Sequence, residues 1–295
     1  MQKGIFSSIV TGVMAITLPT HAAMLLHLDA ASPGSSPTDS WMDLSGNGNH
    51  FTNHDSILDH DNLAFTFGGP DPGPGGYPAA YQVGDADGPR RAYFERADDG
   101  VFDFDTDVTG TGTPFSIVAW SEIGVDDGDD FVSILMAKGA TRANEWKIRP
   151  RKAGSNTELI FNEVPSTDRM YTRADATPFG FHLTMITHDG SGTVGGTKFY
   201  YNGVETAATY NEDNLVGTIL NDAPVRIGGG YDVGAASGRF FEGSIGIIEV
   251  WDEVKDASYA LSRFNGGNPS RVPEPSTLAL LGLGGLVFWA RRRSS

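Results

Sequence analysis

Two groups of carboxylates come nearest to the residue types and spacing that catalysis on sugars requires. Asp103, Asp105 and Asp107 alternate along the sequence, so on a β-strand all three would share one face. Glycoside hydrolases place two carboxylates around one sugar bond, and this spacing offers such a pair. The run contains no Glu, however, and it leads into Val108-Thr109-Gly110, which is typical of a loop.

The second group closes an apolar run near the C-terminus. Glu249 and Asp252 are three residues apart, so on a strand they point to opposite faces. The chain has no cysteine, which excludes a cysteine nucleophile and disulfides. No Ser-His-Asp arrangement or phosphate-binding loop is recognisable either. We therefore predict a protein that is not an enzyme, with a glycoside hydrolase as the alternative.

A dense acidic turn raises the question of a metal. Asp126-Asp127-Gly128-Asp129-Asp130 crowds carboxylates that repel one another, and a bound Ca²⁺ relieves such repulsion. Water and salt around a solvated loop relieve it too. The sequence therefore leaves Ca²⁺ open as a cofactor. The candidate ligands are Asp126, Asp127, Asp129 and Asp130.

Aromatic side chains in loops are candidates for a ligand site, because sugar rings stack on flat apolar faces. Three tryptophans, Trp120, Trp146 and Trp251, occur in strand-like segments and are predicted to lie in the core. The aromatic residues of loop-like segments are Trp41, Tyr77, Tyr171 and Tyr231.

The charge of the chain restricts its partners. The 295 residues carry a formal net charge of −16, and such a surface repels the phosphates of nucleic acids. We therefore expect no nucleic-acid binding. Solubility outside the cell accounts for the excess of acidic residues.

The first residues have the organisation of a secretory signal. Lys3 precedes an apolar stretch from Ile5 to Leu18, and Ala22 and Ala23 are small residues that suit cleavage. The stretch is too short and too rich in Ser, Thr and Gly for a membrane anchor. We predict a signal peptide over residues 1–22.

The C-terminus joins a polar motif, an apolar span and a basic end. The span 276–290 extends roughly 22 Å as a helix, less than the roughly 30 Å of a bilayer core. Arg291 to Arg293 should stay on the cytoplasmic side, which leaves the upstream chain on the far side. The signal peptide requires the same orientation. We predict a linker over 268–272 and a tail over 273–295.

This tail resembles the PEP-CTERM sorting signal in its motif, its short span and its terminal arginines. The resemblance implies that an exosortase, an integral-membrane cysteine protease, recognises and processes the tail in a Gram-negative bacterium that makes exopolysaccharide. It also implies display at the cell surface or in the matrix, with contact to the membrane only through the tail before processing. An ordinary single-pass anchor is the alternative. The matching residues are Pro273, Glu274, Pro275, Arg291, Arg292 and Arg293.

Residues 24–267 predict a β-rich domain. The sequence contains 38 glycines and 16 prolines, which indicates many turns and little helix. Asn202-Gly203 suits a type I′ hairpin turn, and Ala257–Phe264 is the one helix we expect. Strand signals are sparse over residues 32–89. We expect strands at 115–120, 131–136, 145–149, 158–162, 181–187, 198–201, 204–206, 225–227 and 240–251.

Roughly ten short strands without an alternating helix pattern predict an all-β fold, a two-sheet antiparallel jelly-roll sandwich. The order of elements resembles the laminin-G-like, concanavalin A-like jelly roll of bacterial surface proteins. One departure is Phe181-His182, where the family often has a Trp-His pair. The resemblance is carried by segments 43–50, 94–100, 115–120, 134–139, 181–190, 199–203, 225–229 and 241–251.

The sequence thus predicts an exported protein with a non-catalytic binding domain, for polysaccharide or for a surface partner. A glycoside hydrolase and a purely structural matrix protein are the alternatives. Many laminin-G-like domains carry Ca²⁺ at a loop rim, so the resemblance also implies a calcium site, without fixing its ligands.

Overall fold

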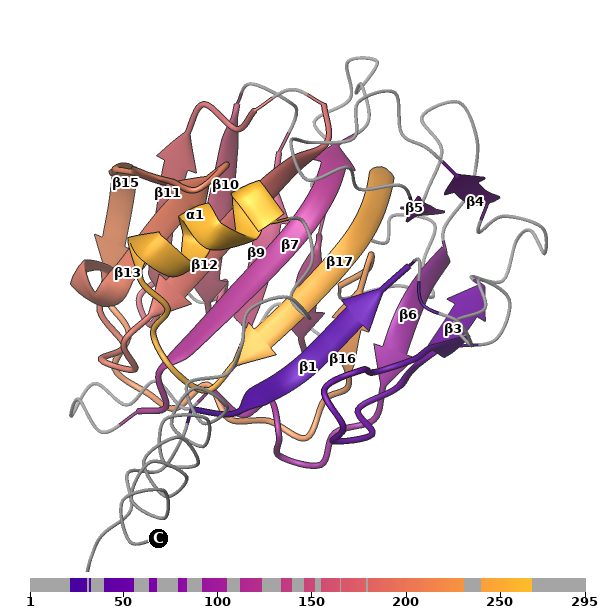
Figure 1. Ribbon diagram of the computed structural model, residues 1–295. Helices are drawn as coiled ribbons and strands as arrows, with labels where there is room; N and C mark the ends of the chain where they lie inside the picture. The colour runs from indigo at the N-terminus through magenta and orange to yellow at the C-terminus, as the bar shows by residue number, and fades with distance from the viewer. Residues whose placement is uncertain are drawn as a thin grey trace, which may run out of the picture.

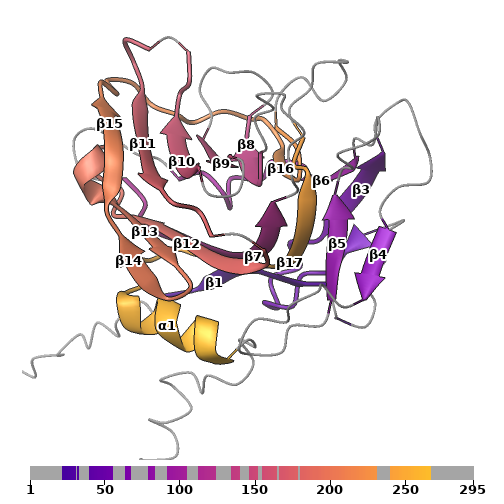
Figure 2. The ribbon, with the colours of Figure 1, turned by 90° about the horizontal axis from the view of Figure 1, so that it is seen from above.

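Two antiparallel sheets packed face to face form the fold of the computed structural model (Figure 1, Figure 2). The segments expected as strands at 145–149 and 158–162 form the neighbouring strands 146–150 and 156–161 of one sheet, and the segment expected at 181–187 forms the strand 182–188 of the other sheet. The structure describes residues 22–30, 32, 40–55, 64–67, 79–83, 92–104, 112–123, 134–139, 146–151, 155–164, 166–178, 180–230 and 240–266.

The first sheet has eight strands in the order β14-β13-β12-β7-β17-β5-β4, with β1 also paired to β17. Gly246 interrupts the register between β17 and β7, and its carbonyl accepts a 2.9 Å hydrogen bond from the Ala30 amide. The strands are β1 (Met24–Asp29), β4 (Ala64–Phe67), β5 (Ala79–Val83), β7 (Phe115–Ile123), β12 (His182–His188), β13 (Thr197–Tyr201), β14 (Val204–Thr206) and β17 (Gly243–Trp251).

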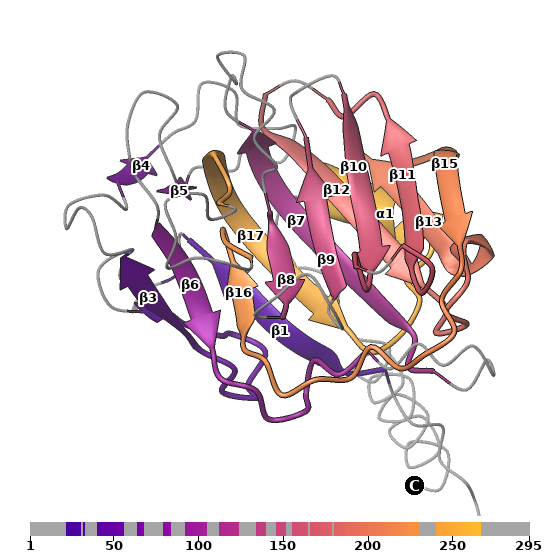
Figure 3. The same ribbon diagram turned by 180° about the vertical axis from the view of Figure 1, so that it is seen from behind.

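The second sheet has nine strands in the order β15-β11-β10-β9-β8-β16-β6-β3-β2, and Figure 3 shows it from its outer side. A short 3₁₀ helix, η1 (Val194–Gly196), precedes β13. The strands are β2 (Ser40–Trp41), β3 (Phe51–Asp55), β6 (Ala92–Arg96), β8 (Met136–Lys138), β9 (Trp146–Pro150), β10 (Asn156–Phe161), β11 (Met170–Asp175), β15 (Ala208–Asp213) and β16 (Val225–Ile227).

Side-chain alternation along the strands divides the buried residues into two layers. In β7, Phe115, Ile117 and Ala119 face the core between the sheets, whereas Val118 and Trp120 belong to a second cluster. Successive side chains of a strand point to opposite faces, so a strand covered on both faces reads as a continuous apolar run. This accounts for the continuous apolar stretch 117–120 in the middle of β7.

The second cluster lies beneath α1 (Ala257–Gly266), on the outer face of the eight-stranded sheet (Figure 1). Phe264 of the helix stacks on Trp120, with ring centroids 5.9 Å apart. Asp256 caps the helix, because its Oδ1 accepts a 2.8 Å hydrogen bond from the Tyr259 amide. The helix therefore covers apolar surface that the sheet would otherwise expose to water.

A buried ion pair fixes α1 to the sheet. Glu249 of β17 pairs with Arg263, and both side chains are almost fully buried. The Tyr259 hydroxyl donates a second hydrogen bond to Glu249, at 2.8 Å. Breaking such a pair by removing one partner leaves an uncompensated buried charge. Glu249, one of the carboxylates considered for catalysis, is therefore a structural group in this fold.

The loop before β3 is organised by Asp43. The Asp43 carboxylate accepts hydrogen bonds from the backbone amides of His27, Ser45 and Asn49 at 2.9–3.0 Å. His50 Nδ1 in turn accepts one from the Asp43 amide at 3.0 Å. This loop lies between β2 and β3 and is hydrogen-bonded to His27 of β1, so the residues that carry the family resemblance here have a structural role.

The predicted antiparallel jelly-roll sandwich is confirmed. The hairpin at Asn202-Gly203 is confirmed as well, since both residues have the positive φ angles of a type I′ turn, 49° and 82°. The sequence misses β1, β6, β11 and β15, and it finds no strand in 32–89, where the structure describes four. Those four are β2, β3, β4 and β5.

The predicted termini lie outside the part of the chain that the structure describes. This holds for residues 1–21 of the signal peptide, for the linker 268–272 and for the tail with its span 276–290. Among the described residues, no helix is both long enough and apolar enough to cross a membrane.

Candidate binding site

Trp41, predicted to be an exposed platform for sugars, is fully buried in β2. Its ring meets Tyr81 edge-on at 4.8 Å and Phe94 at 5.2 Å, between the two sheets. The prediction of exposure is wrong, because β2 turns this side chain inward against aromatic residues of both sheets. Tyr77 and Tyr231 lie outside the described residues.

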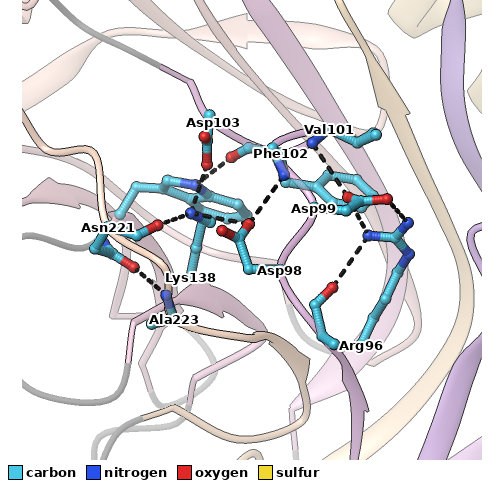
Figure 4. Close-up of polar contacts among 12 residues, drawn as sticks. Arg96, Asp98, Asp99, Val101, Phe102, Asp103, Lys138, Asn221 and Ala223 are labelled. Carbon is cyan, nitrogen blue, oxygen red and sulfur yellow. Dashed lines mark hydrogen bonds and ion pairs between the residues drawn. The ribbon is translucent and has the colours of Figure 1, made fainter.

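Asp103 is held by a buried lysine. Lys138 Nζ lies 2.5 Å from Asp103 Oδ1 and 3.2 Å from Asp98 Oδ1, and it also donates to the Asn221 carbonyl (Figure 4). Lys138 is almost fully buried at the end of β8. The cluster thus links the loop after β6, strand β8 and the loop before β16. Asp103 balances the charge of Lys138, and Asp105 and Asp107 lie outside the described residues.

The four aspartates of the predicted calcium turn, 126, 127, 129 and 130, also lie outside the described residues. Within the described part of the chain, no group of three or more His, Asp or Glu side chains is placed to hold a metal ion. Calcium therefore stays a prediction from the sequence.

Tyr171 lies on a strand rather than in a loop, and it draws attention to the outer face of the nine-stranded sheet. In β11, Met170, Thr172 and Ala174 are buried, whereas Tyr171 and Arg173 are half-buried on the opposite side. The register of β9, β10 and β11 places polar side chains beside them on the same face. We call the following residues the charged face: Lys147, Arg149, Arg151, Glu158, Tyr171 and Arg173.

Glu158 is the centre of the charged face. It is fully buried in β10, opposite Arg149 of β9 and Arg173 of β11. Its carboxylate pairs with Arg149 and lies 3.1 Å from Arg151 Nε. Tyr171 donates a 2.6 Å hydrogen bond to Oε1. Burial raises the pKa of Tyr171 to about 12, and the hydrogen bond and charge of Glu158 add to the shift, so the hydroxyl stays protonated as a donor.

Glu163, just after β10, completes the network. Its carboxylate accepts hydrogen bonds from Lys147 Nζ at 2.8 Å and from Arg149 at 2.9 Å. Burial alone would raise the pKa of Glu163, but attraction and hydrogen bonds from Lys147 and Arg149 outweigh it and lower the pKa to about 2. Glu163 is thus ionised at neutral pH, and its charge compensates the two buried cations.

The rim of the charged face reaches solvent. The Arg151 and Arg173 side chains are 37% and 36% exposed. Arg169 lies over the Tyr171 ring, with its guanidinium carbon 5.5 Å from the ring centroid, and it pairs with Glu212 of β15. A rigid sheet therefore presents an aromatic ring surrounded by hydrogen-bond donors, which is the chemistry needed to bind a polar ligand.

Sequence reasoning missed most of this face. The alternation in β9 was recognisable, because Lys147 and Arg149 flank the inward-facing Ile148. In β11 the same period of two is present from Met170 to Asp175, and it is the signal that could have found the strand. Glu158 gave no sign of its role, since its partners come from two other segments of the chain, Arg149 and Arg151 at β9 and Tyr171 on β11.

The fold and the face define a β-sandwich of the jelly-roll class. The family model for the concanavalin A-like lectin/glucanases superfamily matches residues 96–258, more than half of the 295 residues. The chain therefore belongs to the concanavalin A-like lectin/glucanases superfamily. A second family model, for the PEP-CTERM protein-sorting motif, matches residues 271–294. A search of curated proteins found no match.

Solved structures with the same fold include the binding domain of botulinum neurotoxin DC in complex with rat synaptotagmin II. The TM-score is 0.55 at 12% identity, over 85% of this chain and 53% of that one. For the binding domain of Paraclostridial Mosquitocidal Protein 1 the TM-score is 0.54 at 14% identity, over 83% of this chain and 52% of that one. The chain thus spans about half the length of these binding domains.

A third structure is domain 4 of AbnA, a GH43 extracellular arabinanase from Geobacillus stearothermophilus, in complex with arabinotriose. Its TM-score is 0.50 at 15% identity, over 82% of this chain and 98% of that domain. At such identities the likeness shows the fold alone. Most of these neighbours are described as binding domains.

Proposed function

We propose that this chain is an exported protein whose jelly roll is a non-catalytic binding module for polysaccharide, with the charged face as its site. The observation that carries the proposal is Tyr171, half-buried on a rigid strand and fixed by Glu158 among three arginines. Sugars bind through ring stacking and through directed hydrogen bonds, and this face supplies both. The arabinotriose bound by the similar AbnA domain supports the choice of ligand.

Export and sorting form the second part of the proposal. The signal peptide over 1–22 directs the chain across the inner membrane, and an exosortase processes the tail at Pro273-Glu274-Pro275. The protein then resides at the surface or in the matrix of a Gram-negative bacterium that makes exopolysaccharide. The intact mass of the protein recovered from its host tests this. A chain that keeps residues 1–22 and 273–295 would contradict it.

The proposal assigns no catalysis. Glu249 is paired with Arg263 beneath α1, and Asp103 is paired with Lys138. A retaining or inverting glycosidase needs one carboxylate as acid and another as base or nucleophile, both at the sugar. Suppose that the protein releases reducing sugar from the host's exopolysaccharide and that Asp103→Asn or Glu249→Gln abolishes this release. The protein would then be an enzyme and not a binding module.

A glycan array probed with the purified full chain, with and without Ca²⁺, tests the binding function. Binding to at least one polysaccharide class is expected, and Tyr171→Ala should weaken it. If no glycan binds in either condition, the polysaccharide function is wrong. Loss of biofilm or floc cohesion without glycan binding would then favour a structural matrix protein.

A further inference from the structure

The residue that precedes β1 lies beside a carboxylate that the binding proposal does not use. The Ala23 amide donates a 2.6 Å hydrogen bond to Asp252 Oδ1, at the end of β17. The Asp252 amide in turn donates at 3.2 Å to the Ala23 carbonyl. Sequence reasoning considered Asp252 for catalysis together with Glu249. The structure instead places Asp252 where the chain first joins the fold.

These two hydrogen bonds lengthen the β1–β17 ladder by one residue. Met24 pairs with Trp251 in the antiparallel register, so Ala23 and Asp252 are the next pair along it. Ala23 is exposed, whereas Leu26 of the same segment is fully buried. Chain ends fray unless backbone contacts hold them. The hydrogen bonds with Asp252 therefore hold the beginning of β1 where the core no longer does.

Asp252 carries a charge that no neighbouring side chain balances. Within the described part of the chain, no Lys, Arg or His side chain pairs with Asp252. Lys255 is the cation nearest in sequence, and it pairs with Glu253 and lies over the Trp251 ring, 3.4 Å from its centroid. A charged donor forms a stronger hydrogen bond to a carboxylate than a neutral amide does. The position of Asp252 therefore favours a cation where the Ala23 nitrogen lies.

The proposed signal peptide supplies that cation when it is removed. A cut after Ala22 frees the nitrogen of Ala23, which is the atom that donates to Asp252. Thr20 and Ala22 are the small residues that such a cut requires. A free α-amino group has an ordinary pKa of about 7.7–8.0, so at neutral pH it is mostly protonated. A cut one residue later would remove both hydrogen bonds between Ala23 and Asp252.

We propose that removal of the signal peptide between Ala22 and Ala23 creates an ion pair between the Ala23 α-ammonium group and the Asp252 carboxylate, which fastens β1 to the end of β17. Hydrolysis of this peptide bond consumes one water. Ala22 leaves with the new carboxylate, and Ala23 keeps the nitrogen as an ammonium group. The inference rests on the export part of the proposed function and is independent of the ligand. Maturation thus replaces a neutral hydrogen bond of the precursor with a charged one.

The N-terminus of the protein recovered from its host, read by Edman degradation, is the first test. Ala23 is the expected first residue. A chain that begins at Met24, or at any other residue downstream of the signal peptide, would overturn the inference and leave export standing. A chain that keeps residues 1–22 would contradict both proposals.

Thermal unfolding of the exported chain at pH 7, with its tail and in mild detergent, tests the ion pair itself. Asp252→Asn keeps an oxygen that can accept from Ala23 but removes the charge, so Tm should fall by about 2 °C. Insertion of Ser-Gly between Ala22 and Ala23 keeps the cut after Ala22 and moves the ammonium group two residues away. With this insertion, which N-terminal sequencing verifies, Asp252→Asn should lower Tm by less than about 1 °C.

Asp168→Asn is the matched control, because Asp168 Oδ1 also accepts from backbone amides, those of Val216 and Gly217 at 2.7 and 3.1 Å. Its effect on Tm should be the same with and without the inserted residues, since no chain terminus is involved. If Asp252→Asn also has equal effects in the two backgrounds, the charge on Ala23 contributes nothing and the inference is overturned. Export and saccharide binding would be unaffected by that result.

Discussion

The Tyr171 hydroxyl donates a 2.6 Å hydrogen bond to Glu158 Oε1, across the β10–β11 ladder. The same fully buried carboxylate pairs with Arg149 from β9 on its other side. One anion thereby holds residues of three strands in a fixed arrangement. A face whose groups are fixed before the ligand arrives binds with a smaller loss of entropy.

Removal of the charge of Glu158 should loosen this face. Glu158→Gln leaves the buried Arg149 with less compensation for its charge, so the free energy of unfolding should fall by about 3 kcal/mol. Urea denaturation measures the loss. Glu212→Gln is the matched control: it removes a half-buried partner of Arg169, and the expected loss is below about 1 kcal/mol. Equal losses in the two variants would contradict the central role of Glu158.

Breaking the ion pair beneath α1 should lower the free energy of unfolding, whereas replacing both partners with apolar residues should lower it much less. Arg263→Met leaves Glu249 buried without its cation, so we expect a loss of about 3–5 kcal/mol. Combining Glu249→Leu with Arg263→Met should recover most of that loss, because it removes both charges. Faster amide exchange in α1 should accompany the single variant. A double variant that is less stable than the single one would count against this account.

The hairpin at Gly203 should tolerate no side chain. Gly203 has a φ of 82°, and a Cβ there would lie 2.8 Å from Leu261 Cα of α1. Gly203→Ala therefore adds a clash to backbone strain, and a loss above about 2 kcal/mol is expected. Gly46→Ala is the matched control, because Gly46 has a φ of 92° with open space around it. Its loss should stay near about 1 kcal/mol from strain alone.

The stability of the fold should decrease in acid through His188. Burial lowers the pKa of His188 from 6.5 to about 4, with Asp189 opposing the shift. The unfolded chain thus binds a proton at a pH where the folded chain does not. The stabilisation that comes from the neutral His188 is fully present above pH 6.5 and decreases as the pH falls. Below about pH 4 the total loss in the free energy of unfolding is on the order of 3 kcal/mol.

Denaturation midpoints between pH 7 and pH 4 check this dependence, compared with those of His188→Gln. The variant lacks the titrating ring, so its midpoint should vary less with pH over this window. Burial lowers the pKa of His27 and His182 as well, so some dependence should remain in the variant. Identical pH profiles for the two proteins would show that His188 does not contribute.

The sequence reveals the parts of the fold that depend on nearby residues. Asn202 and Gly203 readily adopt positive φ angles, so these two residues alone indicate a type I′ turn. The apolar run in β7 is long enough to be recognised as a strand. The sorting tail is recognisable for the same reason, since its motif, span and arginines are consecutive. The strand β11 was missed because Tyr171, Arg173 and Asp175 dilute its apolar signal.

The candidate site depends on residues that are distant in sequence. The sequence around Trp41 is typical of a loop, and only its contacts with Tyr81 and Phe94 bury it. Glu158 acquires its role from Arg149, Arg151 and Tyr171, which sheet pairing brings together. A local pattern cannot contain such contacts, because they arise when the strands assemble.

Amide hydrogen exchange of the full chain, with and without a saturating saccharide, tests the central claim most directly. We predict slower exchange in β9, β10 and β11, within residues 146–175, and no change in the hairpin 197–206 of the opposite sheet. Protection confined to the opposite sheet, or its absence from residues 146–175 while the saccharide is bound, would contradict the assignment of the charged face as the binding site.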